Sequence, residues 1–236
     1  MTASDKSPLI ITVVRDPLMY DKCIAHNHYL KGCQLLKIDN TINNETIPIL
    51  YNRAIANCQS LSSRWLVFAH EDFETQEALS LIFEKLDQRS IWGPIGAVTT
   101  VRWPELLGGY YQSQMRGIIN TCWKDGSNKS VAGKRVAAGY EVETLDCMFL
   151  AIHGSLLERS GLRFDENLTF DLYAEDFSMN AKFNHNITTR ILPRLSTFDK
   201  KTPAVAGVLS LGLHHTPTFP QGAERRIFSV AVASAA

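Results

Sequence analysis

Three residues that can bind a metal ion stand side by side after a short apolar run. The run covers residues 65–68, and His70, Glu71 and Asp72 follow it. Four consecutive apolar residues are typical of a strand buried on both faces, and open α/β sheets bind ligands at the carboxyl ends of such strands. Carboxylate oxygens suit Mg²⁺ or Mn²⁺, and an imidazole suits the softer Mn²⁺. The pattern therefore indicates either a metal site or an ordinary charged turn after a core strand.

A second acidic pair, Glu175 and Asp176, precedes a stretch with helical spacing at residues 177–183. Acidic side chains are favoured in the first turn of a helix, where they face the positive end of its dipole. A carboxylate in the same place can also accept the proton of a reacting hydroxyl group. These residues alone leave both interpretations open.

Two further groups of residues could contribute to a site. His214 and His215 could complete a metal shell, or they could simply be solvated. Residues 102–140 show no periodicity, and so long an irregular stretch is either functional or partly disordered. Its aromatic residues, Trp103 among them, could line a pocket for a ring-shaped substrate or anchor the segment to the core.

The elements that position these residues alternate between strands and helices. Strand, helix, strand, helix, strand is the pattern of a parallel sheet with right-handed crossovers. The sequence therefore predicts an α/β fold with a mostly parallel sheet flanked by helices. Expected strands cover residues 9–14, 34–38, 65–68, part of 91–101, 142–152 and 187–192, and expected helices cover residues 21–30, 47–58, 78–86, 155–160 and 177–183.

Capping residues mark the ends of two of these helices. Asn43 or Asn44 can cap the helix that precedes the third strand, with Pro48 near its start. Gly161 is expected to end the helix at residues 155–160, since glycine adopts the left-handed conformation of a helix C-terminus.

Composition places the chain among ordinary globular proteins. It has 236 residues, of which 45% are hydrophobic and 20% are charged. Lys and Arg total 24, as do Asp and Glu, so there is no electrostatic case for nucleic acid or an anionic membrane as a partner. We expect one domain over residues 1–236, with its core at about 8–200 and a poorly patterned segment at 201–236.

Other features of the sequence bear on where the protein is located in the cell. The five cysteines are scattered without CxxC spacing, which favours reduced thiols and a cytoplasmic protein. The first eight residues lack the apolar region of a signal peptide. Residues 202–223 carry no charged residue, but their prolines and histidines make a poor membrane-spanning helix. Peripheral membrane contact stays open.

Four sequence blocks together resemble the GT-A-fold glycosyltransferases, especially family-2-like enzymes of the streptomycin-biosynthesis-type branch. The similarity runs from about residue 8 to 192, and the order and spacing of the blocks make it more specific than any block alone. His70 stands where the family's D-x-D region has its first acidic residue, so only Asp72 matches in kind. The blocks are L-Y-N-R-A-I-A-N at 50–57, L-V-F-A-H-E-D at 66–72, V-E-T-L-D-C-M-F-L-A-I-H at 142–153 with G-L-R-F-D-E-N at 161–167, and Y-A-E-D-F-S at 173–178.

The resemblance implies a nucleotide-sugar donor, a glycan or small-molecule acceptor, and a divalent cation, Mn²⁺ or Mg²⁺. Two of the residues named below could instead have purely structural roles: Asp39 could cap a turn, and Asn52 could form a hydrogen bond between a helix and a loop. The implied general base is Asp176, with Glu175 as the second choice. The implied donor-binding residues are Asp39, Asn52, Glu71 and Asp72, the acceptor-side residues are Asp146 and Trp103, and the metal ligands are Asp72, His70 and His214.

Three functions follow as hypotheses. The first is an inverting, metal-assisted glycosyltransferase of polysaccharide or metabolite biosynthesis. The second is a non-catalytic module that binds sugar nucleotides or glycans on the same fold, because a fold does not fix a function. The third is a nucleotidyltransferase, which would be expected to carry a basic phosphate-binding loop after the first strand, where only Arg15 is found.

Overall fold

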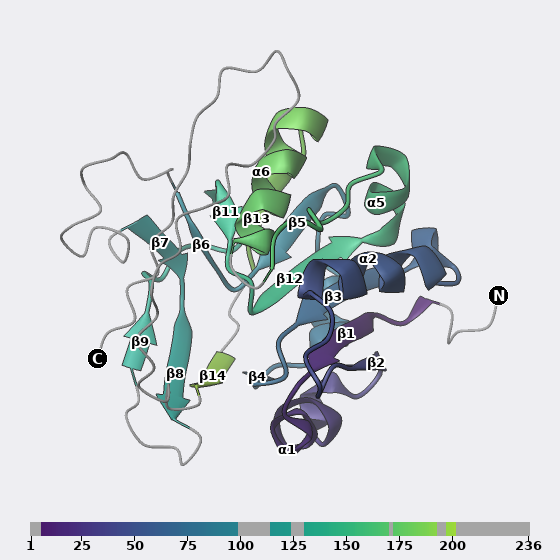
Figure 1. Ribbon diagram of the computed structural model, residues 1–236. Coiled ribbons are helices and arrows are strands. Elements are labelled where there is room, and N and C mark those ends of the chain that lie inside the picture. Colours follow the sequence, from purple (N-terminus) through teal and green to yellow (C-terminus); the bar gives the residue numbers. More distant parts are fainter. Residues whose placement is uncertain (1–5, 99–113, 124–129, 170–171, 193–196, 202–236) are drawn as a thin grey trace.

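A seven-stranded sheet forms the centre of the fold (Figure 1). The structure is a computed structural model that describes residues 6–98, 114–123, 130–169, 172–192 and 197–201. In order across the sheet, the strands are β10 (Glu141–Val142), β13 (Thr188–Ile191), β5 (Ser90–Gly93), β12 (Phe149–His153), β3 (Trp65–Ala69), β1 (Leu9–Val14) and β2 (Gln34–Asp39).

Five of these seven strands run in the same direction. Strands β2, β1 and β3 are parallel neighbours, and β5 and β13 are parallel to each other. Strand β12 lies antiparallel between β3 and β5, and the edge strand β10 is antiparallel to β13. The expected α/β fold with a mostly parallel sheet is confirmed, and the pairing of the first three strands is as predicted.

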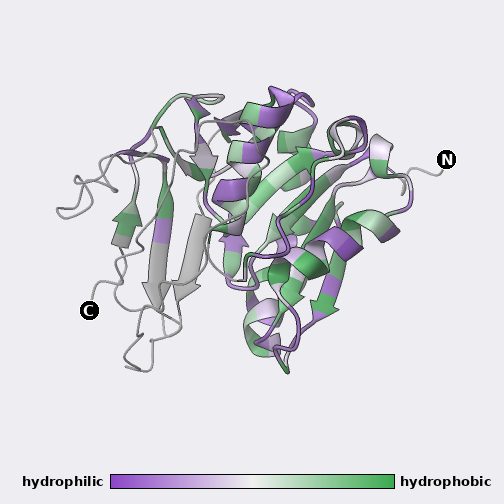
Figure 2. Ribbon diagram, turned by 45° about the horizontal axis from the view of Figure 1, so that its top comes forward, coloured by the Kyte–Doolittle hydropathy of each residue, from purple (hydrophilic) through white to green (hydrophobic). Residues whose placement is uncertain are grey.

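The central strands are apolar throughout because both of their faces are covered. In β1, Ile11 and Val13 belong to one buried cluster, whereas Ile10 and Val14 belong to a second cluster on the other face. Strand β3 alternates between the same two clusters, and all five of its residues are buried. Figure 2 shows these strands as the hydrophobic centre of the molecule.

Helices cover both faces of the sheet. The first cluster receives side chains from α2 (Ile47–Asn57), α5 (Gly154–Ser160) and α6 (Tyr173–His185). The second receives side chains from α1 (Pro17–Tyr20), a π-helical turn at Asp21–Ala25 and α3 (Leu79–Phe83). The flanking helices expected from the sequence are thus present on both faces.

Two smaller sheets continue from the carboxyl side of the main sheet. Part of the segment at 102–140 that showed no periodicity contributes short strands to them. The three-stranded sheet has the order β11 (Thr144–Leu145), β6 (Ile95–Ala97) and β7 (Met115–Gly117), and the four-stranded sheet has the order β4 (Phe73–Thr75), β14 (Thr197–Lys201), β8 (Ile119–Trp123) and β9 (Ser130–Ala132).

The helix expected at residues 21–30 is interrupted. The π-helical turn ends at Ala25 with His26 as its C-cap, and a separate 3₁₀ turn covers His28–Leu30. Asn27 separates them because its side chain accepts a hydrogen bond from the Tyr29 amide and donates one to the Thr75 carbonyl. Such local side-chain bonds compete with the helix and open a new turn.

The expected caps of α2 were wrong, whereas the expected end of α5 was right. The N-cap of α2 is Thr46, and Asn43 instead adopts a left-handed turn conformation with φ of 49°. The Asn40 side-chain amide donates a hydrogen bond to the Glu45 carbonyl at 2.9 Å, and this bond keeps the chain in a loop until Thr46. At the end of α5, Gly161 has φ of 68° and caps the helix.

The single strand expected at residues 142–152 is divided by a turn. The Asp146 carboxylate accepts a hydrogen bond from the Met148 amide at 3.0 Å and bends the chain between β11 and β12. Strand β11 consequently joins the three-stranded sheet, whereas β12 belongs to the main sheet, as does β10, which holds Val142. In the described part of the chain, no helix has both the length and the apolar character needed to cross a bilayer. The expected single domain over residues 1–236 stays a prediction.

Candidate functional site

The carboxyl ends of the first three strands bring several predicted site residues to one edge of the main sheet. Asp39 is the last residue of β2 and lies opposite Val14, the last residue of β1. His70 follows β3, which runs parallel to β1 on its other side. Asp39 and the residues after β3 therefore share the edge at which parallel sheets bind ligands.

His70 is tied to the first turn of α6. Its Nε2 lies 2.8 Å from the hydroxyl of Tyr173, and that hydroxyl donates to the Cys147 carbonyl at 3.3 Å. A hydroxyl has one proton to donate, so the imidazole Nε2 donates to Tyr173 in this arrangement. The bond joins β3, the turn before β12 and α6 at one point.

Tyr173 was not singled out from the sequence, although it opens the block that contains the acidic pair. It is fully buried, and its pKa is raised well above its ordinary value, first by burial and then by Tyr51, Cys147 and the nearby acidic groups. Among those groups are Asp146 and Glu175. A buried, neutral hydroxyl is thus the centre around which the predicted acidic residues gather.

Glu71 connects the ends of β3 and β1. One of its carboxylate oxygens accepts hydrogen bonds from the backbone amides of Arg15 at 2.5 Å and Asp16 at 3.1 Å. These bonds fix the turn after β1 against the turn after β3, so Glu71 has a structural role. Asp72 is the next residue and is half-buried in the same turn.

The pKa of Asp176 is shifted from its ordinary value. Burial raises its pKa to about 6, and the nearby Asp165 carboxylate adds to the rise. Within the described chain, no hydrogen-bond donor reaches the Asp176 carboxylate. Asp165 itself accepts two bonds from Asn167, which hold it in a turn. A carboxyl group with a pKa near neutrality and no fixed donor is suited to accept a proton.

Asp39 and Asn52 make local hydrogen bonds. The Asp39 carboxylate accepts from the Thr41 amide at 3.0 Å, and this bond lowers its pKa while the group stays exposed. Asn52 donates to the Phe164 carbonyl at 2.9 Å and accepts from the Phe164 amide at 3.0 Å. It also donates to Glu166 at 2.9 Å. Asn52 is therefore the brace between α2 and the loop that follows α5, and Asp39 keeps an exposed carboxylate.

The predicted metal ligands are only partly within the described residues. The predicted ligand His214 lies outside them, as does Trp103, which was predicted on the acceptor side. Within them, His70 and Asp72 stand in one turn, yet no group of three histidine, cysteine or acidic side chains is arranged to hold a metal ion. The Nε2 of His70 is already committed to Tyr173. The described residues alone therefore do not fit a complete metal site.

Comparison with known proteins adds a weak likeness in fold. No known protein family matches the sequence, and no curated protein is significantly similar to it. Solved structures similar to this one include GalNAc-T7 crystallised with UDP, GalNAc and Mn²⁺, at 10% identity and a TM-score of 0.48. They also include A197 from STIV, at 12% identity and a TM-score of 0.43. Neither likeness establishes an activity.

The coverage of these two structures differs. The match to GalNAc-T7 covers 83% of this chain and 44% of that one, so this chain spans less than half of its length. The match to A197 covers 81% of this chain and 84% of that one.

Proposed function

We propose that the chain is a glycosyltransferase of the GT-A type, moving a sugar from a nucleotide-sugar donor to an acceptor hydroxyl with inversion. The observation that carries the proposal is Asp176, a partly buried carboxyl group whose pKa is raised to about 6 and which no described donor engages. It lies in the first turn of α6, whose Tyr173 is bonded to the end of β3. This position of the first turn of α6 supports Asp176 as the proposed base.

The proposed reaction uses Asp176 as a general base. Its ionised carboxylate takes the proton of the acceptor hydroxyl as the acceptor oxygen bonds to the anomeric carbon of the donor. The bond from that carbon to the diphosphate breaks, and the nucleoside diphosphate leaves with the electron pair. Above pH 6 the carboxylate is mostly ionised, and a base whose pKa lies near the working pH is the most efficient.

On the donor side, the exposed Asp39 carboxylate at the end of β2 is our candidate for the nucleoside, and Asp72 is our candidate for the diphosphate side. Asp146, close to the Tyr173 hydroxyl, is the candidate on the acceptor side. Dependence on Mn²⁺ or Mg²⁺ remains a proposal, because Asp72 and His70 need at least one more ligand. We assign no step of the transfer to a cation.

A cytoplasmic location remains part of the proposal. Its support is the pattern of the five cysteines, which are scattered along the sequence without CxxC spacing. Peripheral contact with a membrane and a role in polysaccharide biosynthesis stay open beside it.

A non-catalytic sugar-nucleotide-binding module is the second candidate. Its support is the engagement of Glu71 and His70 in internal hydrogen bonds, which leaves fewer groups for chemistry at the edge of the sheet. Incubation with a radiolabelled donor separates the two candidates. A transferase hydrolyses the donor slowly even without its acceptor, whereas a binding module returns the donor intact.

The donor is found first, by a thermal-shift panel of UDP-, GDP- and dTDP-sugars with and without Mn²⁺. A ligand at about 100 times its dissociation constant adds roughly 2.7 kcal/mol of stability, which such a panel detects. With the donor known, Asp176→Asn is compared with wild type. Donor turnover is expected to fall about 10²- to 10⁴-fold while donor affinity is retained.

Asp87→Asn is the matched control, since Asp87 is an acidic residue before β5 at the opposite edge of the sheet. It should leave both turnover and affinity unchanged. Near-normal turnover by Asp176→Asn would remove Asp176 from the mechanism. Failure of every sugar nucleotide to stabilise the wild-type protein would refute the function itself.

A further inference from the structure

A polar groove with a volume of about 500 Å³ lies at the amino edge of the main sheet. It is formed by the C-terminal ends of α5 and α6 together with the turn before β5. Asp176 and His185 are nine residues apart on α6, so the groove is about 14 Å along the helix from the residue proposed as the base. The polar side chains that line it are Arg89, Arg159, Ser160, Asn184, His185 and Asn186.

The groove has a positive lining in a chain whose formal net charge is zero. Two arginines face it, and none of its lining residues is acidic. The C-terminal ends of α5 and α6 each bring a partial negative charge of about one half, which the two guanidinium groups exceed. The Asp87 carboxylate, which is bonded to Arg89, offsets part of the remaining charge, so among the described residues Arg159 is the cation of the groove that no carboxylate pairs.

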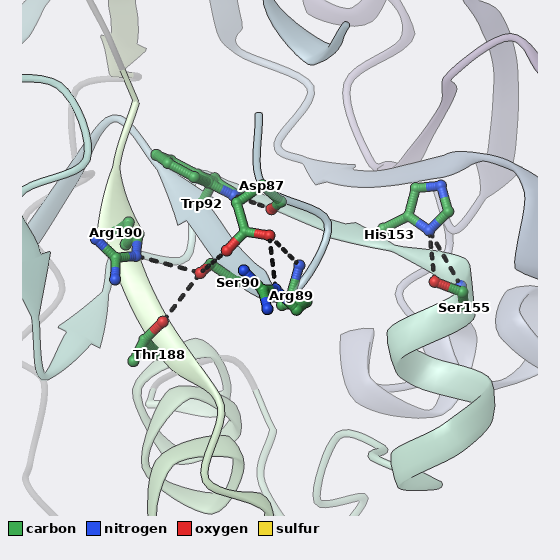
Figure 3. A network of polar contacts seen from close by, with 8 residues as sticks. All are labelled: Asp87, Arg89, Ser90, Trp92, His153, Ser155, Thr188 and Arg190. Atoms are coloured by element: carbon green, nitrogen blue, oxygen red, sulfur yellow. Dashed lines mark hydrogen bonds and ion pairs between the residues drawn. The ribbon is translucent and has the colours of Figure 1, made fainter. Parts of the chain in front are cut away.

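Both arginines have N–H donors that a ligand could use. Arg89 uses its Nε for Asp87, at 3.2 Å, and its side chain is 83% exposed. Figure 3 shows this pair, with Ser90 lying between Asp87 and Thr188. An exposed pair of this kind positions the arginine more than it neutralises it. Within the described residues, no hydrogen bond or ion pair engages the Arg159 guanidinium.

We propose that this groove binds the phosphate group of a soluble phosphate ester. Guanidinium groups present paired N–H donors that match two phosphate oxygens, and a phosphate dianion needs the charge of two cations, where a carboxylate needs one. The amides of Asn184 and Asn186 can donate to remaining oxygens. Leu156 and Ile187 also line the groove, but both belong to the core and expose little apolar surface.

The size of the groove agrees with this ligand class, because small-molecule sites typically have volumes of about 300 to 1,000 Å³. The site is separate from the proposed transfer site and does not depend on that function. Loss of one would leave the other testable.

The test is a titration of the full-length ¹⁵N-labelled protein with inorganic phosphate and with glycerol phosphate, at constant ionic strength held with chloride. Saturable shifts are expected for backbone amides around Arg159 and His185. Arg159→Gln and Arg89→Gln should each weaken binding about 10-fold, because each removes charge-assisted hydrogen bonds. Arg53→Gln is the control, since Arg53 is an ion-paired arginine on α2 outside the groove.

Thermal unfolding of each variant verifies that it is folded before the titration. Unchanged phosphate affinity in Arg159→Gln would overturn the assignment, as would equal loss in Arg53→Gln. Equal shifts with acetate would show a response to any anion and would likewise overturn it. Vesicles containing phosphatidic acid form the last arm, and binding to these alone would exclude a soluble ligand.

Discussion

The titration of Asp176 predicts a pH-dependent stability that an amide at the same position removes. The ordinary pKa of an aspartate is 3.8, and burial and Asp165 raise that of Asp176 to about 6 in the folded protein. The folded state therefore binds this proton more tightly than the unfolded state. Between these two pKa values the folded protein carries the extra proton, so the contribution of Asp176 to the free energy of unfolding falls as the pH rises.

The size of the effect follows from the two pKa values. The rise of the pKa from 3.8 to about 6 corresponds to roughly 3 kcal/mol. Because Asp176 is partly exposed, solvent screening reduces the expected effect to about 1–2 kcal/mol. Asp176→Asn does not titrate, so its stability relative to wild type should increase by that amount between pH 4 and pH 7.

Urea unfolding of both proteins at a series of pH values measures this change. At each pH, the free energy of unfolding of wild type is subtracted from that of Asp176→Asn. The informative quantity is this difference at pH 7 minus this difference at pH 4, because the subtraction cancels any packing effect of the amide. Asp87→Asn is the control, because the pKa of Asp87 is lowered and its removal should act in the opposite direction. A double difference of zero for Asp176→Asn would show that its pKa is not raised.

Three further outcomes are expected. Asn52→Ala removes both bonds to the Phe164 backbone and should lower the free energy of unfolding by about 1–3 kcal/mol in urea denaturation. Burial lowers the pKa of His153, so the stability that this residue contributes is present above its ordinary pKa of 6.5 and is lost as the pH falls. In urea titrations of His153→Gln, this loss of stability at low pH should disappear. Gly154→Ala should give little folded protein by circular dichroism, because the new Cβ would lie 1.8 Å from the Leu61 carbonyl oxygen.

The parallel arrangement of the first three strands, β1, β2 and β3, could be predicted because their residues are compatible with few other arrangements. Strands β1 and β3 are apolar on both faces, and a helix with one apolar face stands before β3. Only a sheet covered on both sides accommodates such strands. The direction of β12 could not be predicted in this way, because Phe149–His153 is a short apolar run that has the same pattern in either direction.

The candidate site was predicted at the level of residues and not of their contacts. Asp176 was identified from the acidic pair and the family resemblance, but its raised pKa comes first from burial and then from Asp165, and both depend on how the chain packs. The bond between His70 and Tyr173 joins residues 103 positions apart. No local pattern encodes such a contact, since it is created by the packing of α6 against the sheet.

The position of β12 between β3 and β5 has a consequence for synthesis on the ribosome. Ala69, at the end of β3, pairs with Phe149, which is made 80 residues later. At about 5–20 residues per second, the apolar edge of β3 waits roughly 4–16 s for its partner. During that interval one edge of this wholly apolar strand is unpaired, and an unpaired apolar edge is prone to aggregation. Expression at high ribosome density should therefore favour inclusion bodies, and co-expressed holdase chaperones should raise the soluble yield.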